Sequence, residues 1–167
     1  MIKLNVSEIK KRLVGKENFK FDVLPKEIEI TDTDLKIQGL IHIVGSISIA
    51  GDVLLVEGKL KTKVGRTCSR CLKEFVSDVE VDISERFFPA NAEYIEKDAF
   101  SYDSDIVDIT EALRESLIIA EPLQALCKKD CKGLCPVCGA DKNVELCNCD
   151  TFTIDPRLVA LKQFLKN

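Results

Sequence analysis

Residues 59–83, KLKTKVGRTCSRCLKEFVSDVEVDI, decide the fold of this chain. The segment DVEVDI, residues 78–83, alternates acidic and apolar side chains, which is typical of a strand with one face in the core and one in water. The segment before it is basic, and the motif Cys68-Ser-Arg-Cys71 lies between the two. The stretch therefore predicts two strands joined by a turn that presents two thiols.

The same period of two extends through most of residues 19–83 and is interrupted by turn residues such as Gly45 and Gly58. In LKIQGLIHI, residues 35–43, apolar and polar side chains again alternate. Short strands joined by tight turns are indicated. We predict an α+β fold, with an antiparallel sheet of short strands that curls toward a barrel, two to three helices and a C-terminal Cys-rich zinc element.

Helical spacing occurs at three places. Residues 6–13 suit a short amphipathic helix. Asp108-Ile-Thr-Glu111 has the spacing of a capping box, and the helix that follows should cover the sheet and end at Pro122. Asp155-Pro156 has the N-cap and first-turn proline of a C-terminal helix. The buried face of the middle helix is predicted to hold Ile109, Leu113, Leu117 and Ala120.

These elements divide the chain into two parts. Residues 1–122 are predicted to form the α+β body, and residues 123–167 the Cys-rich zinc element with its terminal helix. Within the body, residues 85–107 carry acidic and aromatic side chains without a sustained period. We expect them to form a long irregular acidic loop.

The composition excludes several classes of protein. The chain has 167 residues, with 24 basic and 28 acidic side chains, and a formal net charge of −4. No apolar run approaches the roughly 18 residues of a membrane span. The N-terminus lacks the apolar stretch of a secretory signal. We therefore expect a cytoplasmic protein in a reducing compartment, with no membrane partner.

Eight cysteines in a reducing compartment point to metal binding more than to disulfides. Six of them lie within residues 127–149, and the strongest motif is Cys135-Pro-Val-Cys138-Gly139. Two residues between the thiols let backbone N–H groups point back at the first sulfur, and the glycine tolerates the positive φ of a metal knuckle. We predict a tetrahedral zinc site with ligands drawn from Cys127, Cys131, Cys135, Cys138, Cys147 and Cys149.

Six candidates for four positions leave the ligand set open. Cys147 and Cys149 would point the same way in an extended chain, so only one of them is expected to bind. Cys68 and Cys71 resemble half of a ribbon site, and a second metal site that recruits this pair is one alternative. Disulfides or free thiols are the other. Nearby lysines are placed to offset the thiolate charge: Lys128, Lys129, Lys132 and Lys142.

Charge is segregated along the chain. Residues 59–73 contain six basic side chains and no acidic one, whereas residues 74–111 contain twelve acidic side chains. Lys59, Lys61 and Lys63 would lie on one face of a strand about 7 Å apart, a spacing similar to that of successive phosphates on a nucleic-acid strand. A solvated outer face that discourages edge pairing is the alternative interpretation.

No catalytic constellation stands out. Cys131, Cys135 and Cys138 have the spacing of a radical S-adenosylmethionine motif, but the chain that follows is too short for the barrel of those enzymes. The single histidine, His42, lies at an outward strand position and needs no chemical role. The sequence therefore disfavours an enzyme and predicts no small-molecule substrate.

Four stretches carry a resemblance to a known family. They are CSRCLKEF at residues 68–75, the helix of residues 108–121 with Pro122-Leu123, CKGLCPVCG at residues 131–139 with Asn143 and Cys147-Asn-Cys149, and DPRL at residues 155–158. Together they resemble the YceD family, whose members are called large ribosomal RNA subunit accumulation proteins. The resemblance covers the chain from about residue 20 to its end.

The resemblance implies a non-enzymatic cytoplasmic factor that supports accumulation of large-subunit (23S) rRNA and biogenesis of the large ribosomal subunit. Because some relatives lack most of the later cysteines, zinc is expected to stabilise the fold of the C-terminal third and not to perform the function that the family shares. The predicted contacts with rRNA or a pre-ribosomal particle are Lys59, Lys61, Lys63, Arg66, Arg70 and Lys73. The competing hypothesis is a protein-only adaptor, in which acidic residues 74–111 bind a basic ribosomal protein.

Overall fold

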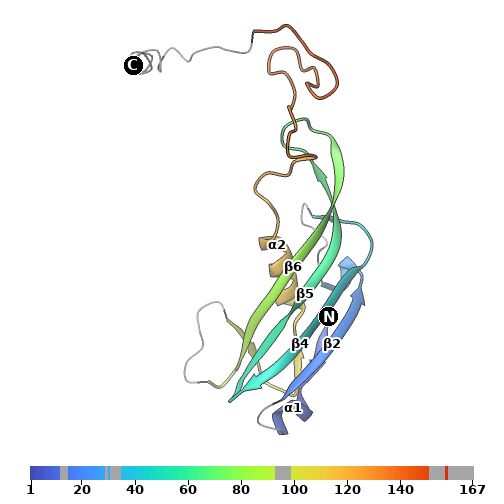
Figure 1. The fold of residues 1–167 in the computed structure, drawn as a ribbon. Helices are drawn as coiled ribbons and strands as arrows, with labels where there is room; N and C mark the ends of the chain where they lie inside the picture. The colour runs from blue at the N-terminus through green and yellow to red at the C-terminus, as the bar shows by residue number, and fades with distance from the viewer. Residues whose placement is uncertain (12–14, 29, 31–34, 93–98, 151–156, 158–167) are drawn as a thin grey trace. The chain divides into compact units, whose positions relative to one another are not determined.

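The computed structural model describes residues 1–11, 15–28, 30, 35–92, 99–150 and 157 (Figure 1). The chain separates into two compact units. The first comprises Met1–Arg66 and Phe75–Leu123, and the second comprises Thr67–Glu74 and Gln124–Asn167. The second unit therefore draws on two distant parts of the sequence, and together these contain all eight cysteines.

The first unit contains a six-stranded sheet with the order β2-β4-β5-β6-β7, in which β3 also pairs with β5. The strands are β2 (Lys16–Val23), β3 (Lys36–Ile37), β4 (Ile41–Ala50), β5 (Val53–Thr67), β6 (Glu74–Pro89) and β7 (Phe100–Tyr102). β2, β4 and β5 pair antiparallel, whereas β7 runs parallel to the end of β6. A second sheet pairs β1 (Lys3–Asn5) antiparallel with β8 (Ile106–Asp108).

One face of the large sheet packs against the helix α2 (Thr110–Ile119), which crosses it in Figure 1. The shorter elements are α1 (Ser7–Lys11) and the 3₁₀ turn η1 (Pro25–Ile28). Strand side chains alternate as the sequence predicts, so that Leu60 is fully buried while Lys61 is exposed. The predicted helix face is confirmed: Ile109, Leu113 and Leu117 are at most 1% exposed, and Ala120 packs partly buried on the same core.

The expected barrel is wrong. Within the described residues the strand order has two ends, β2 and β7, so the sheet is open. A barrel would need β2 and β7 to pair with each other, and among the described residues β7 pairs only with Phe87, Phe88 and Pro89 of β6. The antiparallel arrangement that we expected holds for β2, β4 and β5. The expectation of short strands is wrong, because β5 has 15 residues and β6 has 16. Gly45 and Gly58, which we expected at turns, lie opposite each other inside β4 and β5.

Residues 85–107 are not one irregular loop. They contain the end of β6, the whole of β7 and the start of β8, and only residues 93–98 lie outside the described part. Phe87 is 1% exposed and stacks on Phe100 with ring centroids 5.2 Å apart. This contact between distant aromatic residues explains why strands form where the local pattern predicts none.

The capping box at the start of α2 does not form as expected. Ile109 is the N-cap, and Asp108 accepts a hydrogen bond from the Thr110 N–H at 2.9 Å. Glu111 accepts from Arg114 at 3.0 Å instead of reaching back to the helix start. The helix predicted at residues 6–13 is observed as α1, Ser7–Lys11, and residues 12 and 13 lie outside the described part. The helix predicted to begin at Asp155-Pro156 also lies outside the described residues.

Candidate metal centres

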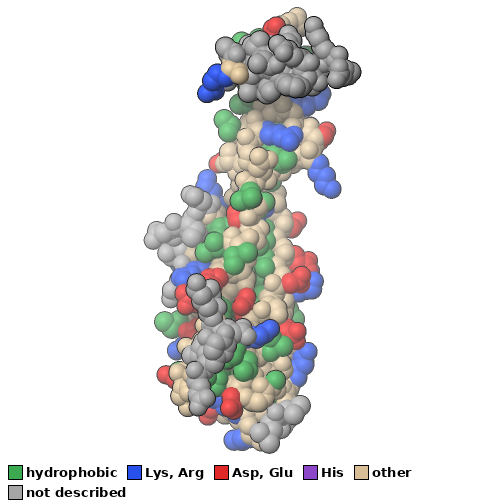
Figure 2. All heavy atoms as spheres, turned by 90° about the vertical axis from the view of Figure 1, so that its left-hand side faces the viewer, with side chains coloured by type: hydrophobic (Ala, Val, Ile, Leu, Met, Phe, Trp, Pro, Cys, Tyr) green, Lys and Arg blue, Asp and Glu red, His purple; other side chains and the backbone are tan. Residues whose placement is uncertain are grey.

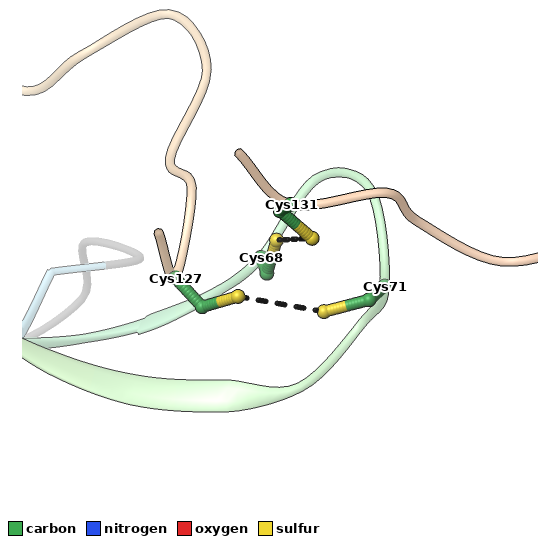
Figure 3. Close-up of side chains that lie close together, drawn as sticks. All are labelled: Cys68, Cys71, Cys127 and Cys131. Carbon is green, nitrogen blue, oxygen red and sulfur yellow. Dashed lines mark hydrogen bonds between the residues drawn. The ribbon is translucent and has the colours of Figure 1, made fainter. Parts of the chain in front are cut away.

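The second unit gathers four sulfurs from the two parts of the chain that form it. Cys68 and Cys71 lie on the turn between β5 and β6, and Cys127 and Cys131 lie on the segment that follows α2. In Figure 3 the four side chains point toward one another. The Sγ atoms all lie within 4.8 Å of one another. We call this set the first cluster.

Distances in the first cluster fit a bound metal better than disulfides. The Sγ atoms of Cys68 and Cys131 are 3.8 Å apart, and those of Cys71 and Cys127 are 3.6 Å apart. A disulfide needs about 2.05 Å. A tetrahedral zinc with Zn–S bonds of about 2.3 Å places its sulfurs about 3.8 Å apart. The spacing therefore suits four thiolates around one tetrahedral ion.

The second cluster is local in sequence. Its members are Cys135, Cys138, Cys147 and Cys149, whose Sγ atoms also lie within 4.8 Å of one another. Both Cys147 and Cys149 belong to it, although we expected only one of them to bind. That expectation assumed an extended chain, and residues 147–149 form no strand. Cys131 lies in the first cluster, apart from Cys135 and Cys138, which removes the spacing argument for a radical S-adenosylmethionine site.

Each cluster contains one Cys-x-x-Cys turn, and the two turns have the same backbone hydrogen bonds. In the first, the Leu72 N–H donates to the Cys68 carbonyl at 2.9 Å. In the second, the Gly139 N–H donates to the Cys135 carbonyl at 2.9 Å. Each turn closes with an N–H from its first cysteine to the carbonyl five residues on, at 2.9 Å in the first and 2.8 Å in the second. The two turns therefore share one backbone geometry, which is the geometry expected of a metal knuckle.

The residue after each knuckle adopts the left-handed conformation. Gly139 has a φ of 77°, which confirms the prediction made from Cys-Pro-Val-Cys-Gly. Leu72 has a φ of 59° at the equivalent position, the one non-glycine residue with positive φ in the described part of the chain. Because a side chain disfavours this conformation, the first knuckle carries strain that the second avoids.

Hydrogen bonds from backbone N–H groups stabilise one thiolate in each cluster. They lower the pKa of Cys68 to about 6, and the N–H of Cys127 contributes most. They lower the pKa of Cys135 to about 6 as well, chiefly through the N–H of Cys138. Anionic sulfur is the form that binds metal, so these knuckles favour the ligating state of their first cysteine.

Other cysteines in the clusters resist ionisation. Burial first, and then the neighbouring sulfurs, raise the pKa of Cys127 to about 12. The Cys138 sulfur first, and then burial, raise the pKa of Cys149 to about 12. Crowded thiols of this kind ionise together when a divalent cation balances their charge. The donor set therefore fits a thiophilic metal ion.

Side chains that do not bind metal support the first cluster. Arg70 donates through Nη1 to the Cys131 carbonyl at 2.9 Å. Asn143 places its Nδ2 at 3.5 Å from the Cys131 sulfur. We predicted Arg70 as an RNA contact and cited Asn143 only within the family resemblance. The periodicity and spacing of the sequence give no signal for either supporting role.

The other predicted RNA contacts fall into two groups. Arg66 is largely buried, with its side chain 10% exposed, and its Nε and Nη2 donate to the Glu121 carboxylate at 2.7 and 2.8 Å. It also contacts Ser77. Arg66 therefore ties β5 and β6 to the residues after α2. Lys63 and Lys73 are exposed, with no ion pair to other described residues.

Two of the strand lysines pair with acids of the neighbouring strand. Lys59 lies 2.9 Å from Glu80 and 3.2 Å from Asp82, and Lys61 lies 3.0 Å from Glu80. These contacts raise the pKa of Lys59 and lower that of Glu80. Figure 2 shows basic and acidic side chains interspersed over the first unit. The charge runs of the sequence therefore face each other across the sheet.

His42 also has a partner on the same sheet. Its Nδ1 lies 2.6 Å from the Asp22 carboxylate, and its side chain is 57% exposed. We expected an outward strand histidine, and the hydrogen bond with Asp22 of β2 adds a contact that the local pattern does not show.

Comparisons with known proteins match most of this chain to one family. The model of the family described as large ribosomal RNA subunit accumulation protein YceD matches residues 56–165. The uncharacterized protein YlbN of Bacillus subtilis is 26% identical over 155 residues, covering 90% of each chain. No solved structure matches the chain. Among the described residues, no helix combines the length and apolar character that crossing a membrane requires.

Mycobacterial relatives match a shorter part of the chain. An uncharacterized protein of Mycobacterium leprae is 31% identical over 102 residues, which is 59% of this chain and 46% of the relative. One of Mycobacterium bovis is 27% identical over 114 residues, which is 66% of this chain and 50% of the relative. The chain therefore spans about half the length of these two relatives.

Proposed function

Because the chain belongs to the YceD family of large ribosomal RNA subunit accumulation proteins, we propose that it supports accumulation of the large-subunit (23S) rRNA. In this proposal it binds the rRNA or a pre-ribosomal particle in the cytoplasm, contributes to biogenesis of the large subunit and catalyses no reaction. The observation that carries the proposal is the family match, which spans residues 56–165 and so includes all eight cysteines.

Zinc is the metal that best suits the two clusters. Four thiolates in a closed tetrahedral set are typical of structural zinc sites, which leave no open position for a substrate. When bound, zinc would contribute folding free energy to a unit that has few apolar residues of its own. The second unit, whose larger part is residues 124–167, is then stabilised by metal, and the sheet belongs to the α+β body.

The metal proposal is tested by analysing full-length protein that was purified without added metal. Two zinc ions per chain and a colourless solution are the expected result. Brown protein that contains iron would show that the clusters bind an iron–sulfur cluster or iron in place of zinc. Protein that is folded throughout the second unit but contains no metal would refute the proposed stabilisation by metal.

Lysines of the first unit are the proposed phosphate contacts. Lys63 on β5 is exposed and free of ion pairs within the described part of the chain, and Lys59 and Lys61 remain more than half exposed despite their acidic partners. Exposed pairs of this kind contribute little to stability, so a phosphate can compete for the lysines. Arg66 and Arg70 are left out, because their guanidinium groups bind other parts of the protein.

Crosslinking of the full chain in cells, followed by sequencing of the captured RNA, tests the function. Enrichment of large-subunit rRNA is expected, and capture of no RNA above background would refute direct binding. In vitro, the triple change of Lys59, Lys61 and Lys63 to Gln should reduce the slope of log affinity against log salt by about three. Gln is preferred to Glu, since Glu would face Glu80 across the strands.

A matched control removes the same three charges elsewhere on the first unit. Lys3, Lys11 and Lys26 are exposed, and their replacement by Gln gives the same net charge as the test variant. The control should bind RNA with the salt dependence of the wild type. Equal loss in both variants would show a general charge effect and would contradict a contact surface on β5.

The pairing of Lys59 and Lys61 with Glu80 and Asp82 also favours a second candidate function. In that case the acidic residues 74–111 bind a basic ribosomal protein, and the chain never contacts RNA. Purification from nuclease-treated extract distinguishes the two: a ribosomal protein retained after complete RNA digestion supports the adaptor, whereas loss of all ribosomal components on digestion supports RNA binding.

A further inference from the structure

Residues 131–135 join the two clusters. Cys131 belongs to the first cluster and Cys135 to the second, and only Lys132, Gly133 and Leu134 lie between them. A connection this short has few conformations. The position of a sulfur in one cluster therefore restricts the position of a sulfur in the other.

This connection is held from two sides. The Leu134 N–H donates to the Arg70 carbonyl of the first knuckle at 3.1 Å, and the Lys142 N–H donates to the Gly133 carbonyl at 2.9 Å. Gly133 has a φ of +71°, and a Cβ there would stand 2.9 Å from the Arg70 carbonyl oxygen. The connection is thus packed between the first knuckle and the loop of the second cluster.

Asn143 lies on that loop, between Cys138 and Cys147, and reaches the first cluster. Its Oδ1 accepts from the Lys132 N–H at 2.9 Å. Its Nδ2 donates to Asp141 at 2.7 Å and lies 3.5 Å from the Cys131 sulfur. An N–H directed at a ligating sulfur favours the thiolate and fixes its orientation. One side chain of the second cluster's loop therefore positions a ligand of the first.

We propose that the two clusters bind metal cooperatively and that Asn143 is the positioning residue that couples them. The proposal rests on the metal binding inferred above. Metal at the second cluster fixes the loop that carries Asn143, and Asn143 then holds Cys131 where the first cluster needs it. By linkage, metal at the first cluster strengthens binding at the second by the same factor.

The experiment is a Zn²⁺ titration of the full-length, metal-free, reduced chain, followed by native mass spectrometry. In the wild type, the one-metal species should stay below the share that two independent sites produce. In Asn143→Ala the one-metal species should accumulate. The second binding step should weaken by about 10- to 100-fold, the usual effect of losing an outer-shell partner of a metal ligand.

Two further variants separate the contacts. Asn143→Asp keeps an acceptor for the Lys132 N–H but has no N–H for the Cys131 sulfur, so it should weaken the second step as Ala does. Val144→Ala is the matched control, because Val144 is 83% exposed and lies next to Asn143 on the same loop. It should titrate like the wild type. The titration of each variant reports metal binding and needs no functional assay.

Substitution of the cysteine ligands provides a test that does not depend on whether the Asn143 variants fold. Cys138→Ser removes a ligand of the second cluster and should weaken binding at the first, and Cys71→Ser should weaken binding at the second by a similar factor. Independent filling of the wild type, or unchanged titration of Asn143→Ala, would overturn the coupling while metal binding stands. A chain that binds no Zn²⁺ would overturn the metal proposal itself.

Discussion

Replacing Gly139 by Ala isolates one physical cost at the second knuckle. Gly139 has a φ of +77°, and apart from Gly139 and its two chain neighbours no residue places a heavy atom within 4 Å of the position that a Cβ would take. The change therefore introduces no clash and only forces an L-residue into the left-handed region, which costs about 1–2 kcal/mol. A less flexible unfolded chain recovers about 0.4–1 kcal/mol. The net loss of about 1 kcal/mol corresponds to about five-fold weaker metal binding.

Leu72 provides the opposite substitution in the same protein. It has a φ of 59° at the equivalent position, and its side chain is 65% exposed, so glycine there removes strain and little buried surface. After the entropy cost of glycine, Leu72→Gly should strengthen metal binding at the first cluster by about two-fold.

Competition with a chelator of known Zn²⁺ affinity measures both changes. The measurement follows the transfer of metal from the full-length chain, and thermal unfolding of the loaded protein provides a second readout. Opposite signs for the two variants are expected. If Gly139→Ala binds as tightly as the wild type, or if Leu72→Gly binds more weakly, then the left-handed residue does not limit the knuckle and the reasoning is refuted.

Three more predictions concern folding. Chelation of the metal should expose residues 67–74 and 124–150 to hydrogen exchange while α2 stays protected, and unchanged protection of those residues would contradict metal-dependent folding. Leu113→Ala should lower the free energy of unfolding of the first unit by about 2–5 kcal/mol in urea titrations, because Leu113 is fully buried. Burial, and then the charge of Glu115, raise the pKa of Glu85, so its ionised form destabilises the fold above that pKa. Glu85→Gln should therefore raise the unfolding temperature at neutral pH, with a smaller gain below about pH 4, where wild-type Glu85 is protonated.

Local patterns predicted those elements whose partners are close in sequence. Alternation gave the strands, and helical spacing gave the buried face of α2. The prediction failed at residues 85–107, where Phe87 of β6 stacks on Phe100 of β7 and buries an aromatic pair that no local period reveals. It failed also for the barrel, because closure depends on how the two ends of the sheet meet.

The candidate metal centres also have features that the sequence predicts and features that it does not. The Cys135–Cys138 knuckle and its left-handed glycine follow from residue spacing alone. The assignment of Cys131 does not, because its sulfur partner Cys68 lies 63 residues away and is reached only through the fold. Spacing treats the six later cysteines as alternatives for one site, whereas the chain sorts all eight into two sets of four.

Charge shows why a sequence run is a weak guide to a binding surface in a sheet protein. Residues 59–73 are basic and residues 74–111 are acidic, yet β5 and β6 are neighbours, so Lys59 and Lys61 meet Glu80. Basic and acidic side chains that face each other on adjacent strands stabilise the pairing of those strands. Their electrostatic potentials cancel at a distance. A basic strand therefore indicates nucleic-acid binding only through side chains that make no ion pair with the neighbouring strand. Among the described lysines of β5 the one of this kind is Lys63, and the salt dependence of RNA binding should be most sensitive there.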